Sequence, residues 1–357
     1  MSGTPPGPPT ATAAAPDITV IVVFHTRLQF LPLAIESVLR QDLPAARFEV
    51  LVVGPHRPPE LVERSSDPKL TFVECSEVGL GNKIAAAARQ ATTPLVAFLE
   101  DDDLFEPNHL SRVLSSFRAD PTLTYFQNGY HSIDGQGKAN PQPGPPVTAM
   151  HRWSHRGLIR VPGRPLPRDL ARMVGIPVGF NNSSIAVRRE LLERGADLLD
   201  QVDMLVDVTL LYLALTAPGA LVFDPIPITA LRRHAASNSD PTTADSAEQL
   251  RRLREFQTNA QRRRESLVAF VRREGPAAVV ASIVAQRDIG EVIFSLRDPG
   301  VPRSARATSL LRTLGATRSF EVRRYWTAVP LGFLSLFAPS LGTRVYIRLR
   351  RQLYGME

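Results

Sequence analysis

Short apolar runs rich in β-branched residues constrain the fold of this chain more than any other feature. The three clearest runs are residues 18–24 (ITVIVVF), 48–53 (FEVLVV) and 95–99 (LVAFL). Continuous apolar runs of this length are typical of strands buried on both faces of a parallel sheet. Helical spacing of apolar residues follows in segments 31–41 and 79–91,. The alternation predicts a doubly wound α/β domain over roughly residues 17–234.

Four consecutive carboxylates, Glu100 to Asp103, directly follow the third run. Carboxylates packed together raise one another's pKa values, so a folded protein usually gives them a cation or hydrogen-bond donors. Oxygen ligands without a neighbouring Cys or His favour Mg²⁺ or Mn²⁺, which commonly bind together with a substrate phosphate. The carboxyl end of a buried strand is also where ligands bind in open α/β sheets. The alternative is a solvated acidic loop at the N-terminus of the helix predicted after Pro107.

The second half of the predicted domain is less regular. Residues 127–177 contain many Gly and Pro residues and Trp153, and we predict a long binding loop,. Helices are predicted at 189–194 and 204–215, and short strands at 221–223 and 228–231. Beyond Ser239 the sequence predicts a helical, arginine-rich region, residues 240–357.

Composition narrows the setting. Residues 1–16 hold only small residues and proline, apart from Met1, which predicts a disordered tail without the basic and apolar parts of a secretion signal,. Cys75 is the only cysteine, so the chain forms no internal disulfide, and we expect a cytoplasmic protein,. The net charge of +7 comes almost entirely from arginine. Many of the arginines stand close together late in the sequence, and clusters of this kind are typical of surfaces that bind nucleic acid or an anionic membrane,. The alternative is a solvated helix face.

A strongly apolar segment lies near the end of the chain, at residues 326–341. Pro330 and Pro339 interrupt it, and it is shorter than the ~20 residues that a spanning helix needs,. Arginines flank it on both sides, so we predict a membrane-surface segment at residues 323–351. The alternative is a helix packed on the preceding domain.

The order of motifs resembles the GT-A-fold glycosyltransferases of family 2, over roughly residues 18–239. Residues 20–27 and 33–41, with the string Ala-Ile-Glu-Ser-Val-Leu, look like the first strand, nucleotide loop and helix of the family. The resemblance implies a GT-A domain at residues 17–239 that moves a sugar from a nucleotide-sugar donor to a hydroxyl acceptor. A glycan or lipid-linked acceptor would fit a membrane-surface enzyme.

The acidic stretch matches the DXD region of that family. By this match Asp102 binds Mn²⁺ or Mg²⁺, with Asp103 as a further metal residue. Asp101 and Asp103 support the metal or contact the donor, and Glu100 stands where Asp is more usual. Arg232 to Ser239 looks like the segment that closes the family's site, which makes His234 a metal or diphosphate ligand.

On the acceptor side, residues 180–184 (FNNSS) and 188–192 (RRELL) resemble the segment before the family's Glu-Asp pair, which here is Val206-Asp207. The resemblance makes Asp207 the general base of an inverting transfer, with a helix-surface carboxylate as the alternative. Asn181 and Asn182 are then acceptor residues, and we place Trp153 of the long loop with them.

The donor side departs from the family pattern. Where the family has Asp-Asp-Gly-Ser after the second strand, this chain has Gly54-Pro55-His56-Arg57, so no carboxylate reads the donor base. We expect His56 or backbone groups to do so. The remaining donor residues predicted from the nucleotide loop and the following helix are Phe24, His25, Arg27 and Lys83, with Arg89 a weaker diphosphate candidate.

Two other functions remain open from the sequence. A nucleotidyltransferase would share the fold and the metal, but the usual Gly-rich first loop with Arg and Lys is missing. A degenerate scaffold with an arginine-rich tail would bind nucleic acid or membrane, but few aromatic residues stand among those arginines and no nucleic-acid motif occurs.

Overall fold

The computed structural model describes most of the 357-residue chain, namely residues 16–58, 70–77, 79–140, 150, 153–202, 205–234, 264–297, 300–314 and 322–354. The predicted disordered tail, the end of the motif at Ala235 to Ser239, the domain boundary at residue 239 and the arginines from Arg251 to Arg263 lie outside these residues.

The predicted parallel strands are confirmed. The strands are β1 (Ile18–Val23), β2 (Phe48–Gly54), β3 (Leu70–Glu74) and β4 (Leu95–Glu100). They pair in parallel in the order β3-β2-β1-β4. Every side chain of β1 is buried because alternate residues face opposite cores: Ile21 and Val23 enter one, and Val20 and Val22 the other. Their carboxyl ends therefore meet at one edge of the sheet.

Beyond β4 the sheet becomes mixed. Strand β8 (Ile185–Arg188) lies antiparallel between β4 and β6 (Leu123–Ile133), and β6 pairs in parallel with β9 (Ala220–Arg232). Two short strands, β5 (Leu104–Phe105) and β7 (Ile159–Pro162), pair with β9. Among the described residues these strands complete a nine-stranded sheet.

The expectation of one long loop at residues 127–177 was wrong for part of that range. Strand β6 continues to Ile133, and β7 and the short helix α6 (Pro167–Ala171) follow. Gln127 and Asn128 are fully buried in β6 and make hydrogen bonds, which is why a polar sequence forms an interior strand there. The two short strands predicted at residues 221–231 are one bulged strand, β9.

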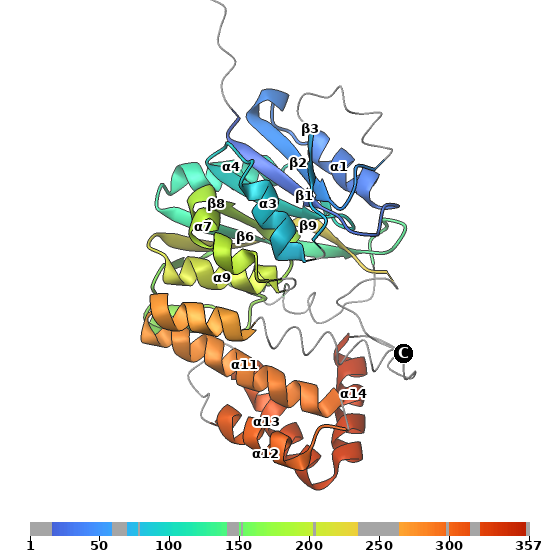
Figure 1. The fold of residues 1–357 in the computed structure, drawn as a ribbon, viewed down its shortest axis with the longest axis vertical. Helices are drawn as coiled ribbons and strands as arrows, with labels where there is room; N and C mark the ends of the chain where they lie inside the picture. Colours follow the sequence, from blue (N-terminus) through green and yellow to red (C-terminus); the bar gives the residue numbers. More distant parts are fainter. Residues whose placement is uncertain are drawn as a thin grey trace, which may run out of the picture.

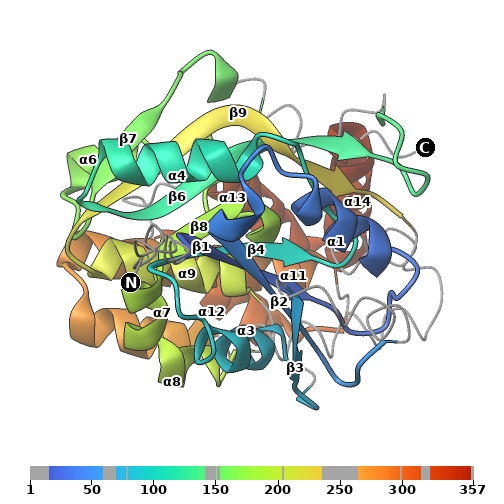
Figure 2. The ribbon, with the colours of Figure 1, turned by 90° about the horizontal axis from the view of Figure 1, so that it is seen from above.

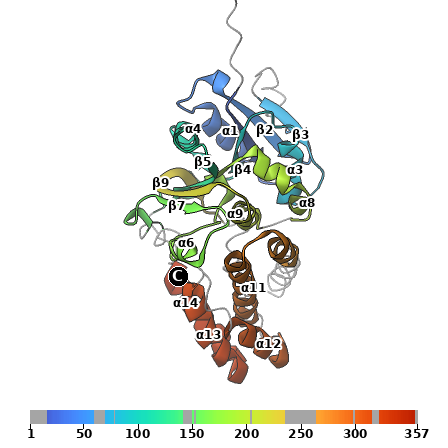
Figure 3. The same cartoon turned by 90° about the vertical axis from the view of Figure 1, so that its left-hand side faces the viewer.

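Helices cover both faces of the sheet (Figures 2 and 3). Helices α1 (Leu31–Leu39) and α4 (His109–Ala119) pack on one face. Helices α3 (Leu80–Ala88), α7 (Arg189–Arg194), α8 (Ala196–Leu199) and α9 (Val206–Thr216) pack on the other. Helix α9 has an apolar side chain at nearly every position because the helix at residues 264–274 covers its outer side, through Leu267 and Val271.

The C-terminal region is helical, as predicted. Figure 1 shows α11 (Ala277–Arg297), α12 (Arg303–Leu314), α13 (Val322–Phe337) and α14 (Pro339–Tyr354) extending away from the sheet. Helices α11, α12 and α13 share a small core that includes Val292, Leu310 and Ala328. None of the helices in the described part of the chain is long and apolar enough to cross a membrane.

The apolar segment at residues 326–341 is divided between α13 and α14. Ala328, Leu331 and Ser335 are buried, so one side packs within the helical region. Phe333 and Phe337 are 44% and 76% exposed, so the other side faces solvent. The buried side packs against α11 and α12 of the helical region, and the membrane-surface role stays a prediction.

Candidate active site

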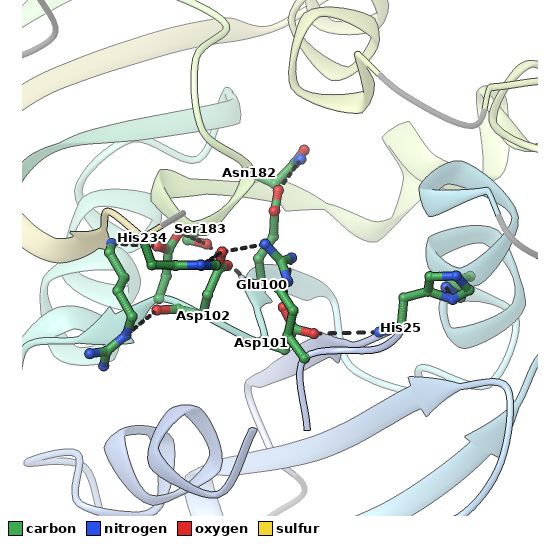
Figure 4. A network of polar contacts seen from close by, with 11 residues as sticks. His25, Glu100, Asp101, Asp102, Asn182, Ser183 and His234 are labelled. Carbon is green, nitrogen blue, oxygen red and sulfur yellow. Dashed lines mark hydrogen bonds and ion pairs between the residues drawn. The ribbon is translucent and has the colours of Figure 1, made fainter. Parts of the chain in front are cut away.

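The loops after β1 and β4 meet at the carboxyl edge of the sheet. Arg27, in the loop after β1, forms ion pairs with both Asp101 (2.7 Å) and Asp102. The backbone N–H of His25 donates to Asp101 Oδ2 at 3.4 Å. These contacts tie the nucleotide loop to the acidic stretch (Figure 4).

Asp102 is also held from the end of β9. His234 Nε2 lies 3.0 Å from Asp102 Oδ2, and Arg232 Nε donates to the Asp102 carbonyl oxygen at 2.8 Å. The Phe30 ring packs 4.8 Å from the His234 ring and 4.9 Å from the Arg232 guanidinium carbon. The structure therefore brings Asp102 and His234 together across 132 residues, as the motif order predicts.

The other two acids are held by the segment between β6 and β8. Asn182 Nδ2 donates to Glu100 Oε1 at 2.9 Å, and Ser183 Oγ donates to Asp103 Oδ2 at 2.6 Å. The backbone N–H of Arg232 donates to Asp103 Oδ1 at 3.0 Å. Each oxygen of the buried Asp103 thus accepts one hydrogen bond from the protein, which fixes the carboxylate, and its role as a metal ligand stays a prediction.

Asp207 is connected to the acidic stretch through the same segment. It lies in the first turn of α9, where its Oδ2 accepts the N–H of Asn181 at 3.1 Å and its Oδ1 accepts the N–H of Val208 at 2.8 Å. Asn181 adopts a left-handed backbone (φ 66°), and its side chain accepts the N–H of Ser183. The segment 181–183 therefore contacts Asp207 at its first residue and Glu100 and Asp103 at its next two.

Burial perturbs the acidic cluster. Removal from water raises the pKa of Glu100 to about 7 and that of Asp101 to about 6, in both cases with a further upward contribution from the Asp102 charge. Burial raises the pKa of Asp103 well above its usual value. A site that holds several acids at this cost favours binding of positive charge.

The residues fit a divalent cation in part. Two ligands at right angles, each about 2.1 Å from a Mg²⁺ ion, lie about 3 Å apart, which is the spacing of Asp102 Oδ2 and His234 Nε2,. No three His, Cys, Asp or Glu side chains in the described residues are grouped around a metal position. A cation held here would therefore take its other ligands from water and substrate phosphate, as Mg²⁺ commonly does.

The missing carboxylate after β2 has a packing explanation. The Phe24 ring is buried against Gly54, and a Cβ at position 54 would overlap that ring. An acidic side chain therefore does not fit at position 54 while Phe24 keeps its place. The exposed His56 ring packs edge-on against Phe24, with centroids 6.1 Å apart. Of the two donor residues predicted here, His56 reaches solvent, whereas the side chain of Phe24 belongs to the core.

The remaining predicted residues divide between the site and other places. Lys83 Nζ lies 3.2 Å from His25 Nδ1 and is almost fully buried, with its pKa lowered by burial. Arg89 pairs instead with Asp200 on the surface. Trp153 is completely buried in the main core, so it does not present its side chain to an acceptor.

Three residues without an assigned role in the sequence interpretation support the site. Ser183 donates to Asp103 and accepts the N–H of Glu100 at 3.0 Å. Arg232 connects β9 to the acidic stretch. Gln127 donates to the carbonyl oxygens of Pro177 and Phe180 and accepts the N–H of Gly179, which fixes the approach to Asn181. Ser183 and Arg232 lie inside the recognised motifs. Gln127 lies in no motif, and its role becomes visible only because it is part of strand β6.

Replacing Glu100 by Gln should remove a pH-dependent loss of stability. Because the pKa of Glu100 is raised to about 7, the folded state binds this proton more tightly than the unfolded state, and stability falls as pH rises from about 4.5 to about 7,. With chelator present, Glu100→Gln should match the native protein at pH 5 and exceed it at pH 8 by up to roughly 3 kcal/mol. Denaturant unfolding at both pH values measures this.

Gln keeps the acceptor for Asn182 and removes only the charge. Glu190 is an exposed acid on α7, so Glu190→Gln serves as the control and should show no pH-dependent gain. An equal stability difference for Glu100→Gln at pH 5 and pH 8 would contradict the burial argument.

Comparison with known proteins agrees with this architecture. The Glycosyl transferase family 2 model matches residues 19–194. The crystal structure of S. aureus TarS 1–349 has 15% identity and a TM-score of 0.57, covering 94% of this chain and 91% of that one. The same protein in complex with UDP has 13% identity and a TM-score of 0.53, covering 89% and 90%. No curated protein sequence matches the chain.

At these identities the solved structures establish the fold, and the family model assigns residues 19–194 to the family. The parallel strands β1 to β4, the acidic stretch and the Asn181 segment all lie within the matched residues. Residues 19–194 belong to glycosyl transferase family 2, in a chain with a GT-A fold.

Proposed function

We propose that this protein transfers a sugar from a nucleotide-sugar donor to a hydroxyl acceptor, with inversion and with help from Mn²⁺ or Mg²⁺. The observation that supports this best is that one short segment contacts both the acidic cluster and the base candidate. Residues 181–184 contact Glu100 and Asp103 of the acidic cluster and also the base candidate Asp207. A glycosyl transfer needs these two features on either side of the sugar.

The donor would bind at the carboxyl edge of β1, β2 and β4. Arg27, Lys83 and His25 offer positive or hydrogen-bonding groups for a diphosphate, and His56 stands at the exposed end of β2. Asp102 and His234 would hold the cation, which when bound supplies Lewis-acid stabilisation of the negative charge on the leaving diphosphate. S. aureus TarS, which shares the fold, has been solved with UDP, and this is consistent with a nucleotide at this edge.

Asp207 would act on the acceptor. Its two backbone hydrogen bonds fix the carboxylate beside the segment that contacts the acidic cluster. As the acceptor oxygen attacks the anomeric carbon and the sugar–phosphate bond breaks, the hydroxyl proton passes to Asp207 and the nucleoside diphosphate leaves. Asn181 and Asn182 border this position.

A panel of nucleotide sugars tests the donor part of this proposal. We expect one of them to raise the melting temperature of the protein in the presence of Mn²⁺ or Mg²⁺ and to be slowly hydrolysed. With chelator, both effects should disappear. Absence of cation-dependent binding for every common sugar nucleotide would contradict the proposal.

We also propose that the tip formed by α12, α13 and α14 binds an anionic membrane surface, which would bring the enzyme to a lipid-linked or polysaccharide acceptor. Phe333, Phe337 and Leu341 are exposed there, and Arg303 lies 5.7 Å from the Phe337 ring. Arg344 follows on α14 and is exposed. Apolar side chains next to arginines are the combination that interfacial segments use.

The double variant Phe333→Ser, Phe337→Ser should bind vesicles more weakly than the native protein. Each Phe that enters the lipid contributes apolar burial of about 1.5 to 3 kcal/mol, so the double variant should lose at least about 10-fold in binding to vesicles with anionic lipid. Co-sedimentation measures the loss. Leu33, which is 51% exposed on α1, provides the control variant Leu33→Ser. Equal binding of native and double-variant proteins would contradict the membrane proposal.

A further inference from the structure

We propose that Arg27 weakens cation binding at Asp102 until a nucleoside diphosphate draws it away, so that metal and nucleotide bind cooperatively. This rests on the proposed function and adds a device that regulates access to its site. The inference starts from the carboxylate that the metal needs, because that carboxylate already has a cationic partner.

The oxygen at issue is Asp102 Oδ2. It contacts both Arg27 Nη1 and His234 Nε2. A carboxylate oxygen offers about two lone-pair positions, so these two contacts use both of them. A cation that is to bind this oxygen must displace one partner. A cation held between Asp102 and His234 would take the lone pair that faces His234, and Arg27 would remain beside the ion as a competing positive charge.

Arg27 also neutralises the charge that attracts a cation. Its second nitrogen pairs with Asp101 at 2.7 Å, so one guanidinium spans two adjacent carboxylates. A divalent ion placed beside this guanidinium would meet a like charge at short range. The cluster is therefore a weaker cation site with Arg27 present than without it.

Arg27 is placed to move. It lies in the loop after β1, and its side chain is 18% exposed, whereas Asp101 is completely buried. The guanidinium is therefore at the solvent side of the pair, where a ligand at the carboxyl edge would arrive. Arginine binds phosphate in the same bidentate way as carboxylate, so a diphosphate offers an exchange of partners at little cost.

The exchange predicts coupling between the two ligands. When phosphate takes Arg27, the Asp102 charge is no longer neutralised and attracts the cation, and the cation in turn stabilises the phosphate. Such coupling is reciprocal, so Mn²⁺ should strengthen nucleotide binding by the same factor by which nucleotide strengthens Mn²⁺ binding. Removal of Arg27 should loosen this coupling, because the competing positive charge would then be absent from the start.

Mn²⁺ binding followed by electron paramagnetic resonance tests the inference without any turnover. Without nucleotide, Arg27→Ala should bind Mn²⁺ about 10- to 100-fold more tightly than the native protein, the equilibrium change expected from losing charge-assisted hydrogen bonds that compete with it. Adding UDP or GDP should tighten Mn²⁺ binding strongly in the native protein and much less in the variant.

Two further variants keep the result interpretable. Arg27→Gln retains hydrogen-bonding capacity without charge, so it should also bind Mn²⁺ more tightly than the native protein. It replaces Arg27→Ala in the test if the alanine variant does not fold. Arg40 is 76% exposed at the end of α1, so Arg40→Ala removes one positive charge elsewhere and should leave Mn²⁺ affinity unchanged.

The outcomes separate this inference from the function on which it rests. If Arg27→Ala and Arg27→Gln bind Mn²⁺ no more tightly than native protein while Asp102→Asn abolishes binding, Arg27 does not weaken cation binding and the metal site stands. If neither native nor variant protein binds Mn²⁺ with either nucleotide, the metal part of the proposed function fails, and this inference fails with it.

Discussion

Asp207→Asn is expected to lower turnover by about 10²- to 10⁴-fold, or about 3 to 5 kcal/mol of barrier, because a general base typically contributes this much. Asparagine retains an oxygen that accepts an N–H of Asn181 or Val208, so the start of α9 should keep its shape. Donor affinity should remain close to native. Initial rates at saturating donor and acceptor, with donor binding measured separately, check both parts.

Asp197 offers a matched control for this variant. It is an exposed carboxylate in the first turn of α8, so it shares the helix position of Asp207 without its contacts to residue 181. Asp197→Asn should retain native turnover. A loss of less than about 10-fold in Asp207→Asn would remove Asp207 from the role of base.

Asp102→Asn should abolish cation-dependent donor binding. An amide is a poorer ligand for a hard divalent ion than a carboxylate. The change also removes the charge that Arg27 and His234 contact. We expect donor affinity in Mn²⁺ to fall by more than about 100-fold, beyond the loss typical of residues that only support metal ligands. Calorimetric titration with the donor, in Mn²⁺ and in chelator, measures the difference.

The control for Asp102 is Asp200, whose carboxylate pairs with Arg89 on the surface. Asp200→Asn removes the same charge from an ion pair remote from the acidic stretch and should leave donor binding unchanged. Unchanged Mn²⁺-dependent affinity in Asp102→Asn would exclude Asp102 as the metal ligand.

The parallel half of the sheet could be predicted from sequence because its strands leave a direct signal. Strands buried on both faces, such as β1, are apolar at nearly every position, with Thr19 the one polar residue of β1. The acidic stretch stands out at the end of β4. The mixed half gave a weaker signal. Strand β6 contains Gln127, Asn128 and Gly129, and these polar residues are buried only because β9 and the 177–180 loop provide partners.

The contact between two site candidates could be predicted from the order of motifs in the sequence. The exposure of a candidate side chain could not, because it depends on packing in the folded chain. Asp102 and His234 were found from motif order, and the structure places them in contact. Trp153 was placed with the acceptor because it lies in a Gly- and Pro-rich segment, but its side chain fills the core. The reason for Gly54 could not be predicted, because the ring that occupies its space belongs to Phe24, 30 residues earlier.

The fate of the donor tests the central claim most directly, because it shows which bond is broken. The donor that the panel selects can be followed by ¹H and ³¹P NMR with Mg²⁺ present. We predict that nucleoside diphosphate and free or transferred sugar appear together, with the sugar first formed in the anomeric configuration opposite to that of the donor. Release of nucleoside monophosphate with sugar phosphate, or no donor consumption at all, would contradict glycosyl transfer at this site.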